Sequence, residues 1–225
     1  MHAERSQTQT DEGFQDPSLP ARLPTSPLTW YVLLGLTLLV GTFTLIFYTA
    51  GRSARAETRG DQLAALLLHE ARQIAPIDWD ATWQRELLSA RLIAAAISSA
   101  VFVEDLELRE GHEDASIAFF NKHYCIEVRP SPRTEPDTEP DDADPALEVV
   151  AWPRSTVGPA TSVFFHPEDA ESAYSRNLQA GYVDNQVDKH PAPGFPHRRN
   201  DGHLGAWDYR GYDDERWLLR ERPTR

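Results

Sequence analysis

A run of apolar residues near the start of the chain constrains its fold more than any other feature. No charged residue occurs between Arg22 and Arg52, and most of Leu28–Ala50 is large and apolar. About 20 such residues in a helix cross the roughly 30 Å hydrocarbon layer of a bilayer. Trp30 and Tyr48 near the two ends are typical of the membrane–water interface. The run predicts one membrane-spanning helix, with Leu28–Ala50 in contact with lipid.

A cleaved signal peptide is the main alternative, because Ala54-Arg55-Ala56 has the small-x-small pattern of a cleavage site. The preceding residues 1–27 are acidic rather than basic, and the apolar run exceeds the usual signal core of about 7–15 residues. We therefore expect an uncleaved anchor.

The side of the membrane on which the C-terminal part lies stays open. Arg52, Arg55 and Arg59 follow the span, whereas only Arg22 lies close before it, which favours a cytoplasmic C-terminal part. A short anchor with its large domain outside the cytoplasm is nevertheless the commoner bacterial plan. Lysine occurs only at positions 122 and 189, a usage typical of GC-rich bacterial genomes, so we expect a bacterial inner membrane.

Composition excludes several classes of protein. The chain of 225 residues allows one ordinary domain with appendages. Its formal charge is −13, with 35 acidic and 22 basic residues, so we expect no nucleic-acid partner, because its surface would repel phosphates. A single cysteine, Cys125, excludes an intrachain disulfide, and we expect it to be buried in a strand.

The pattern divides the chain into four parts. We expect a disordered tail over 1–27, the transmembrane helix over 28–50, a helical stem over 51–76 and an α+β domain over 77–225. Within that domain, residues 130–145 hold five prolines and six acidic residues and predict a flexible, disordered insertion.

Helical periodicity marks the stem and the start of the domain. Asp61 is placed to cap a helix whose apolar residues recur with helical spacing, and Pro76 would stop it. A second helix follows, with apolar residues in alternating steps of four and three at Trp83, Leu87, Ala90, Ala94, Ile97 and Val101. We expect this seam to pack on the protein's own sheet; a partner helix is the alternative.

Strand patterns fill most of the remainder. Runs 102–108 and 117–128 predict a hairpin, with Tyr124, Ile126 and Val128 on one face of the second run. Further short strands are expected over 146–152 and 161–165, a helix over 168–181, an irregular segment over 189–205 and a terminal hairpin over 207–219. The fold class is therefore α+β, a small antiparallel-sheet domain of five or six strands.

Histidines and acidic residues in the C-terminal part are weak candidates for a metal site. They are His166, Asp169, His197, Asp201 and His203, with His190 nearby. Imidazoles and carboxylates are suitable ligands, but the spacing matches no established pattern, and solvated loop histidines explain it equally. Because no Gly-x-Ser-x-Gly or glycine-rich phosphate loop occurs, we assign no catalytic residue, cofactor-binding residue or cofactor, and Ser155, Ser162 and Ser172 have no distinguishing context.

Four aromatic residues near the C-terminus, Trp207, Tyr209, Tyr212 and Trp217, suit either a core or a binding platform. Alternating aromatics in a small domain are more often core, so we expect these residues to be buried.

The order of apolar helix, amphipathic stem and small sheet resembles the outline of bacterial pseudopilins. The chain departs from that family because it has no Gly-Phe leader junction and no glutamate near the start of its apolar helix. We expect a membrane-anchored binding or assembly component, with a homo-oligomer or an envelope protein as partner. A membrane-tethered metal-dependent hydrolase and a pseudopilin-like subunit are the alternatives.

Overall fold

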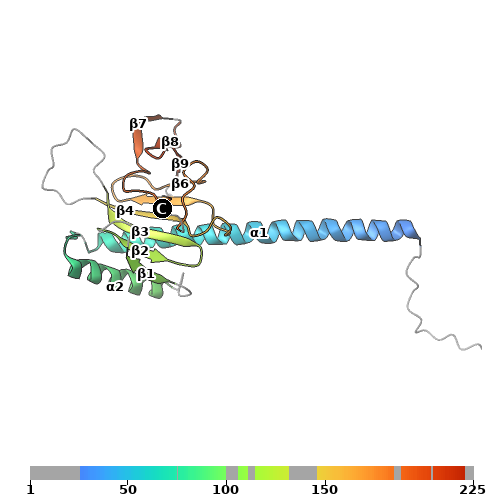
Figure 1. The fold of residues 1–225 in the computed structure, drawn as a ribbon, viewed down its shortest axis with the longest axis horizontal. Helices are drawn as coiled ribbons and strands as arrows, with labels where there is room; N and C mark the ends of the chain where they lie inside the picture. Colours follow the sequence, from blue (N-terminus) through green and yellow to red (C-terminus); the bar gives the residue numbers. More distant parts are fainter. Residues whose placement is uncertain are drawn as a thin grey trace, which may run out of the picture. The chain divides into compact units, whose positions relative to one another are not determined.

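The computed structural model describes residues 26–74, 76–99, 106–110, 115–131, 146–184, 189–203 and 205–220. Within these residues the chain has two helices and nine strands, the α+β class that the sequence predicts. The helices are α1 (Pro27–Arg72) and α2 (Thr82–Ser98). The strands are β1 (Glu107–Glu110), β2 (Ile117–Phe120), β3 (Tyr124–Pro130), β4 (Leu147–Pro153), β5 (Val163–Pro167), β6 (Ala173–Ser175), β7 (Arg198–His203), β8 (Asp208–Gly211) and β9 (Arg216–Leu219) (Figure 1).

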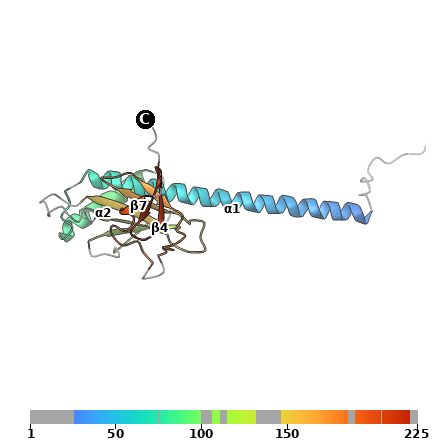
Figure 2. The same cartoon turned by 90° about the horizontal axis from the view of Figure 1, so that it is seen from above.

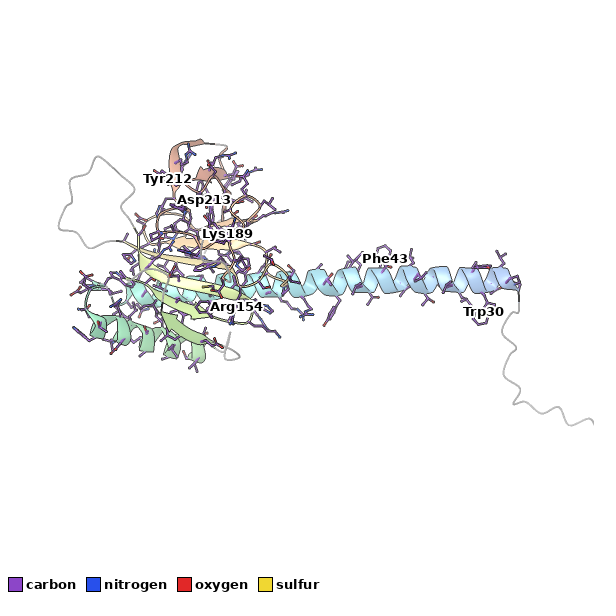
Figure 3. The ribbon with its side chains drawn as sticks, viewed as in Figure 1. Trp30, Phe43, Arg154, Lys189, Tyr212 and Asp213 are labelled. Carbon is purple, nitrogen blue, oxygen red and sulfur yellow. The ribbon has the colours of Figure 1, made fainter. Side chains whose placement is uncertain are left out.

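Helix α1 contains 46 residues and runs without a break in both views (Figures 1 and 2). Its N-terminal part is apolar and exposed, and the helix is long and apolar enough to cross a membrane. Trp30 and Phe43 project outward from it (Figure 3). The chain divides into two compact units between Ile46 and Phe47, and the second unit holds the rest of α1 together with the sheet.

The predicted helix start at Asp61 is wrong, because α1 continues through this residue. Residues 51–60 include two alanines, three arginines and one glutamate, which favour a helix, and no proline interrupts them. Asp61 is instead a buried residue in the middle of a helix. The helix ends at Arg72, before the predicted stop at Pro76.

All strand pairs in the nine-stranded sheet are antiparallel, in the order β1-β2-β3-β4-β5-β6-β9-β8-β7. The sheet is larger than predicted, partly because the run 117–128 forms two strands. Asn121 makes the turn between them, where its Oδ1 accepts hydrogen bonds from the backbone N–H groups of His123 and Tyr124, both at 2.7 Å. The predicted antiparallel pairing with the preceding strand is confirmed, but that strand is Glu107–Glu110 rather than 102–108, and residues 102–105 lie outside the described part.

The predicted helix over 168–181 is wrong, because Ala173–Ser175 is a strand between β5 and β9. After this strand, three successive backbone N–H groups at positions 178–180 donate to the buried Glu215 carboxylate. A side chain 35 or more positions away therefore replaces the hydrogen bonds that a helix would make locally. The segment predicted to be irregular likewise contains a strand, β7.

Two apolar cores lie on the two faces of the sheet. One core joins both helices to Ile126, Val128, Val149 and further residues of β2–β5. The other contains Cys125, Val150, Trp152 and Trp217. The predicted alternation along β3 and the buried position of Cys125 are therefore confirmed.

The predicted orientation of α2 is wrong. Leu88, Leu92 and Ala96 are buried against the sheet, whereas the predicted seam faces outward. Two apolar rows run along this helix, and the row spaced by four residues is the one that the sheet covers. Val101, the last predicted member of the seam, lies outside the described residues.

The terminal hairpin is confirmed as β8 and β9. Its aromatic residues are divided: Tyr209 and Trp217 are buried, as predicted, whereas Trp207 and Tyr212 are exposed. The tail over 1–25 and residues 132–145 of the acidic insertion lie outside the described part of the chain.

Candidate functional site

The structure separates the histidines proposed as metal ligands. His166 lies opposite Val149 on the sheet face that carries α1. His197 contacts Glu148, the residue before Val149 in β4, on the other face. Asp169 is exposed, and the side chains of Asp201 and His203 lie outside the described part. Among described residues, no group of three or more His, Cys, Asp or Glu side chains is arranged to hold a metal ion.

His166 belongs instead to a polar cluster centred on Asp61. His166 Nε2 lies 3.1 Å from Asp61 Oδ1, and His166 Nδ1 lies 2.9 Å from Ser172 Oγ. The guanidinium of Arg220 forms an ion pair with the other oxygen of Asp61. Asp61 and His166 are buried, whereas Arg220 is 42% exposed at its side chain. The cluster connects α1 to β5 and to the residue that follows β9.

Electrostatics keep Asp61 ionised. Burial alone would raise the pKa of this carboxyl, because it disfavours the charged form. Hydrogen bonds from His166 and Arg220, together with the charges of both partners, outweigh burial and lower the pKa. The buried end of the cluster therefore holds a carboxylate that forms an ion pair with Arg220 and a hydrogen bond with His166.

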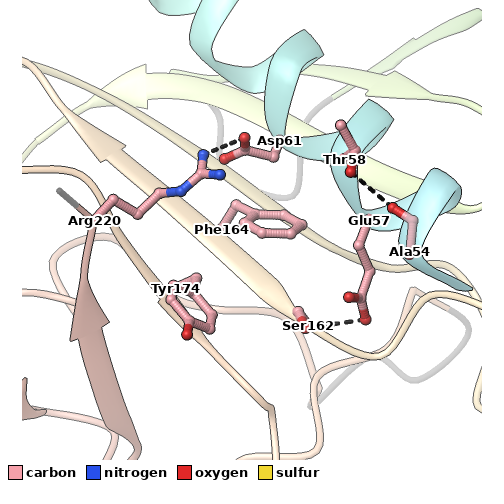
Figure 4. A pocket seen from close by; sticks show the side chains of 8 residues that line it. All are labelled: Ala54, Glu57, Thr58, Asp61, Ser162, Phe164, Tyr174 and Arg220. Atoms are coloured by element: carbon pink, nitrogen blue, oxygen red, sulfur yellow. Dashed lines mark hydrogen bonds and ion pairs between the residues drawn. The ribbon is translucent and has the colours of Figure 1, made fainter. Parts of the chain in front are cut away.

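A pocket of about 350 Å³ opens beside this cluster (Figure 4). Helix α1 contributes Glu57 and Asp61, and the sheet contributes Phe164 and Tyr174. Glu57 Oε1 accepts hydrogen bonds from the hydroxyls of Ser162, at 3.1 Å, and Thr161, at 2.8 Å. The hydroxyl of Ser53 also donates a hydrogen bond to the Pro159 carbonyl. Together these contacts hold residues 53–57 of α1 against the loop before β5.

Ser172, His166 and Asp61 form a hydroxyl–imidazole–carboxylate chain of the kind that nucleophilic catalysis uses. This arrangement cannot be recognised in the sequence, because its members are 105 and six residues apart and no local motif connects them. Ser172 does not line the pocket beside Asp61. It also does not line a second pocket, which lies beside His197 on the other face of the sheet. Arg220 moreover occupies the free side of the carboxylate. These contacts suit a structural clamp better than an activated nucleophile.

The opposite face of the sheet contains a second buried charged cluster. Arg129 donates to Glu148 Oε1 from Nε at 2.7 Å and to Glu127 Oε2 from Nη1 at 3.1 Å. His197 Nε2 lies 3.1 Å from Glu148 Oε2, and the hydroxyl of Ser131 donates to the same oxygen. Burial would raise the pKa of Glu148, but hydrogen bonds from His197 and Arg129 lower it. This cluster fastens the loop before β7 to the centre of the sheet.

Outside the apolar part of α1, helix α2 also carries exposed apolar side chains. We call this surface the α2 stripe, and it consists of Trp83, Leu87, Ala90, Ala94 and Ile97. All five side chains are exposed: the relative exposure is 64% at Trp83, 44% at Leu87 and 52% at Ile97. Contiguous apolar surface of this kind marks interaction sites in soluble domains. The spacing of apolar residues predicted this stripe correctly, but the prediction that it packs on the protein's own sheet is wrong.

Searches of protein-family models, of curated proteins and of solved structures found no match to this chain.

Proposed function

We propose that the chain is a single-pass, membrane-anchored assembly component that binds a protein partner through the α2 stripe. The exposure of this stripe is the observation that carries the proposal. A helix that packs one apolar face on its own sheet and presents a second apolar face has the form of an interaction element. The scarcity of lysine supports a bacterial source, and the apolar part of α1 supports a membrane location.

The contacts of α1 support a permanent anchor rather than a removed signal peptide. The candidate cleavage motif Ala54-Arg55-Ala56 lies inside the helix, and Ala56 is buried against the domain. Ser53 and Glu57, on either side of it, bond to the loop before β5. Cleavage after Ala56 would remove part of the helix that the domain packs on.

Cross-linking of the full-length chain in its membrane, followed by mass measurement of the detergent extract, tests this proposal. We expect a cross-linked complex that Leu87→Glu abolishes, because burying an unpaired carboxylate within the stripe is costly. Trp207→Glu is the matched control, because Trp207 is 63% exposed and lies outside α2. The proposal would be refuted if the unmodified chain and the Trp207→Glu control both remained monomeric and without a partner.

A membrane-tethered hydrolase is the second candidate function, and the Ser172–His166–Asp61 chain favours it. In such an enzyme His166 would accept the proton of the Ser172 hydroxyl, and Asp61 would orient the imidazole. Labelling by a fluorophosphonate probe that Ser172→Ala removes and Ser155→Ala retains would establish this activity. Absence of labelling on the folded chain would leave the cluster as a clamp.

A further inference from the structure

We propose that the partner of the α2 stripe is the same helix of a second copy of this chain, lying parallel and in register. This inference rests on the proposed assembly function and names the partner. It follows from three features of α2: the side on which the stripe lies, the order of its charges, and its fixed position on the sheet.

The stripe lies on the side of α2 away from the sheet. Successive residues of an α-helix are rotated by about 100°, which places the five members within an arc of about 80°. Leu88 and Leu92 point to the opposite side and are fully buried in the domain core. A second helix can therefore approach the stripe without displacing any contact between α2 and the sheet.

The spacing of the stripe is that of a helix pair. Its steps of four, three, four and three residues are the a and d positions of a heptad. In this frame Glu86 occupies a g position and Arg91 the e position five residues later, and both side chains are exposed. They flank the stripe on its two sides.

The charges select a parallel second copy. In a parallel, in-register pair a g residue meets the e residue of the following heptad in the other chain. Glu86 then meets the partner subunit's Arg91, and the two-fold symmetry forms this ion pair twice. In an antiparallel pair g positions face g positions and e positions face e positions, so that Glu86 would face Ile93 and Arg91 would face Gln84. Neither of those contacts pairs opposite charges.

The short length of the stripe does not prevent association. An isolated helix of 17 residues loses conformational freedom when it forms, but α2 is already folded on the sheet. A shared bilayer also raises the effective concentration of the two copies. A seam shorter than three heptads is therefore sufficient here.

Charge exchange in the full-length chain, reconstituted in phosphatidylcholine vesicles, tests the orientation. Glu86→Arg places arginine against arginine in the homodimer, and Arg91→Glu places glutamate against glutamate. Each variant alone should self-associate about tenfold more weakly, because two attractive contacts become repulsive. A mixture of the two variants should form heterodimers as readily as the unmodified chain, because both contacts again join opposite charges.

Disulfide formation tests the register. Ala90→Cys should oxidise to a covalent dimer, because a d residue faces its own symmetry copy. Val157→Cys is the control: Val157 is 92% exposed, lies in the loop between β4 and β5, and is predicted not to cross-link. Both variants keep the buried Cys125, so its background is the same in each.

The outcomes separate this inference from the proposed function. Heterodimer rescue together with an Ala90→Cys cross-link supports the parallel pair. A complex with a different protein that Leu87→Glu abolishes, without self-association, overturns the second copy but keeps the assembly function. Self-association that the charge exchange does not change overturns the parallel orientation. A chain that stays monomeric and binds no other protein overturns both the second-copy inference and the proposed assembly function.

Discussion

Gly60 of α1 lies directly against the ring of Tyr124 on β3. A Cβ atom built at Gly60 would stand 2.5 Å from Tyr124 Cδ2 and 2.6 Å from Cε2. Tyr124 is fully buried, so its ring has no solvent side to move into. The close contact between helix and sheet therefore depends on the absence of a side chain at this helical position.

Gly60→Ala should destabilise the domain even though alanine is the better helix former. The gain in helix propensity is about 1 kcal/mol, but overpacking a filled core typically costs about 1–3 kcal/mol or more. We expect a net loss in the free energy of unfolding, measured by denaturant titration. Gly51→Ala is the control in the same helix, because nothing lies within 4 Å of its added Cβ, and it should not destabilise the chain.

Asp61→Asn should loosen α1 from the sheet. The substitution removes the charge that His166 and Arg220 share, and hydrogen bonds to a charged group contribute about 1.5–3 kcal/mol. The partly exposed Arg220 can recover some solvation, so we expect the lower end of this range. Thr58→Ala, which removes only an exposed hydroxyl bonded to its own helix, should change stability by less than about 0.5 kcal/mol. Equal losses in both variants would contradict a clamp at Asp61.

Local patterns predicted those parts of the fold that neighbouring residues determine. The apolar run before Arg52, the alternation along β3 and the terminal hairpin follow from periodicity and turn residues. The segment over 168–181 could not be read in this way, because Glu215, distant in sequence, accepts its backbone N–H groups. The seam of α2 was recognised, but two apolar rows compete on that helix, and only the assembled sheet shows which row it covers.

The polar clusters depend still more on long-range geometry. Asp61 appeared as a helix cap because it precedes apolar residues with helical spacing, yet its partners are His166 and Arg220. His166 and His197 appeared together because both lie in a histidine-rich part of the sequence. In the structure His166 lies on β5 opposite Val149, whereas His197 lies in the loop before β7 and contacts Glu148 on the other face of the sheet. Such pairings require knowledge of strand order, which composition and spacing do not contain.

Glu148→Gln should destabilise the domain at neutral pH and weaken its sensitivity to acid. Arg129 would lose one of its two buried carboxylate partners, and breaking a buried ion pair costs about 3–5 kcal/mol. The folded state lowers the pKa of Glu148 from its ordinary value of 4.5. Its stabilising contribution is therefore complete above pH 4.5 and is lost as the pH falls through the lowered pKa. Unfolding titrations at several pH values should show a smaller acid-induced loss in the variant.

Asp213→Asn should show the opposite dependence on pH. Burial raises the pKa of Asp213 above its ordinary value of 3.8, against hydrogen bonds from Tyr182, Trp217 and the Glu215 backbone that oppose the shift. Folding therefore favours the protonated carboxyl, and the charged form costs stability as the pH rises from 3.8 through the raised pKa. Asparagine does not ionise, so the stability of the variant relative to the unmodified chain should improve between pH 3 and pH 7.

The hydrogen bonds at this position provide the control for that measurement. Tyr182 donates to Asp213 Oδ2 at 2.9 Å, and Trp217 Nε1 donates to Oδ1 at 3.2 Å. Tyr182→Phe removes the first of these bonds but leaves the carboxyl able to ionise. Because that bond opposes the rise in pKa, its loss should raise the pKa of Asp213 further and steepen the loss of stability with rising pH. If both variants kept the pH profile of the unmodified chain, the titration of Asp213 would not be coupled to folding.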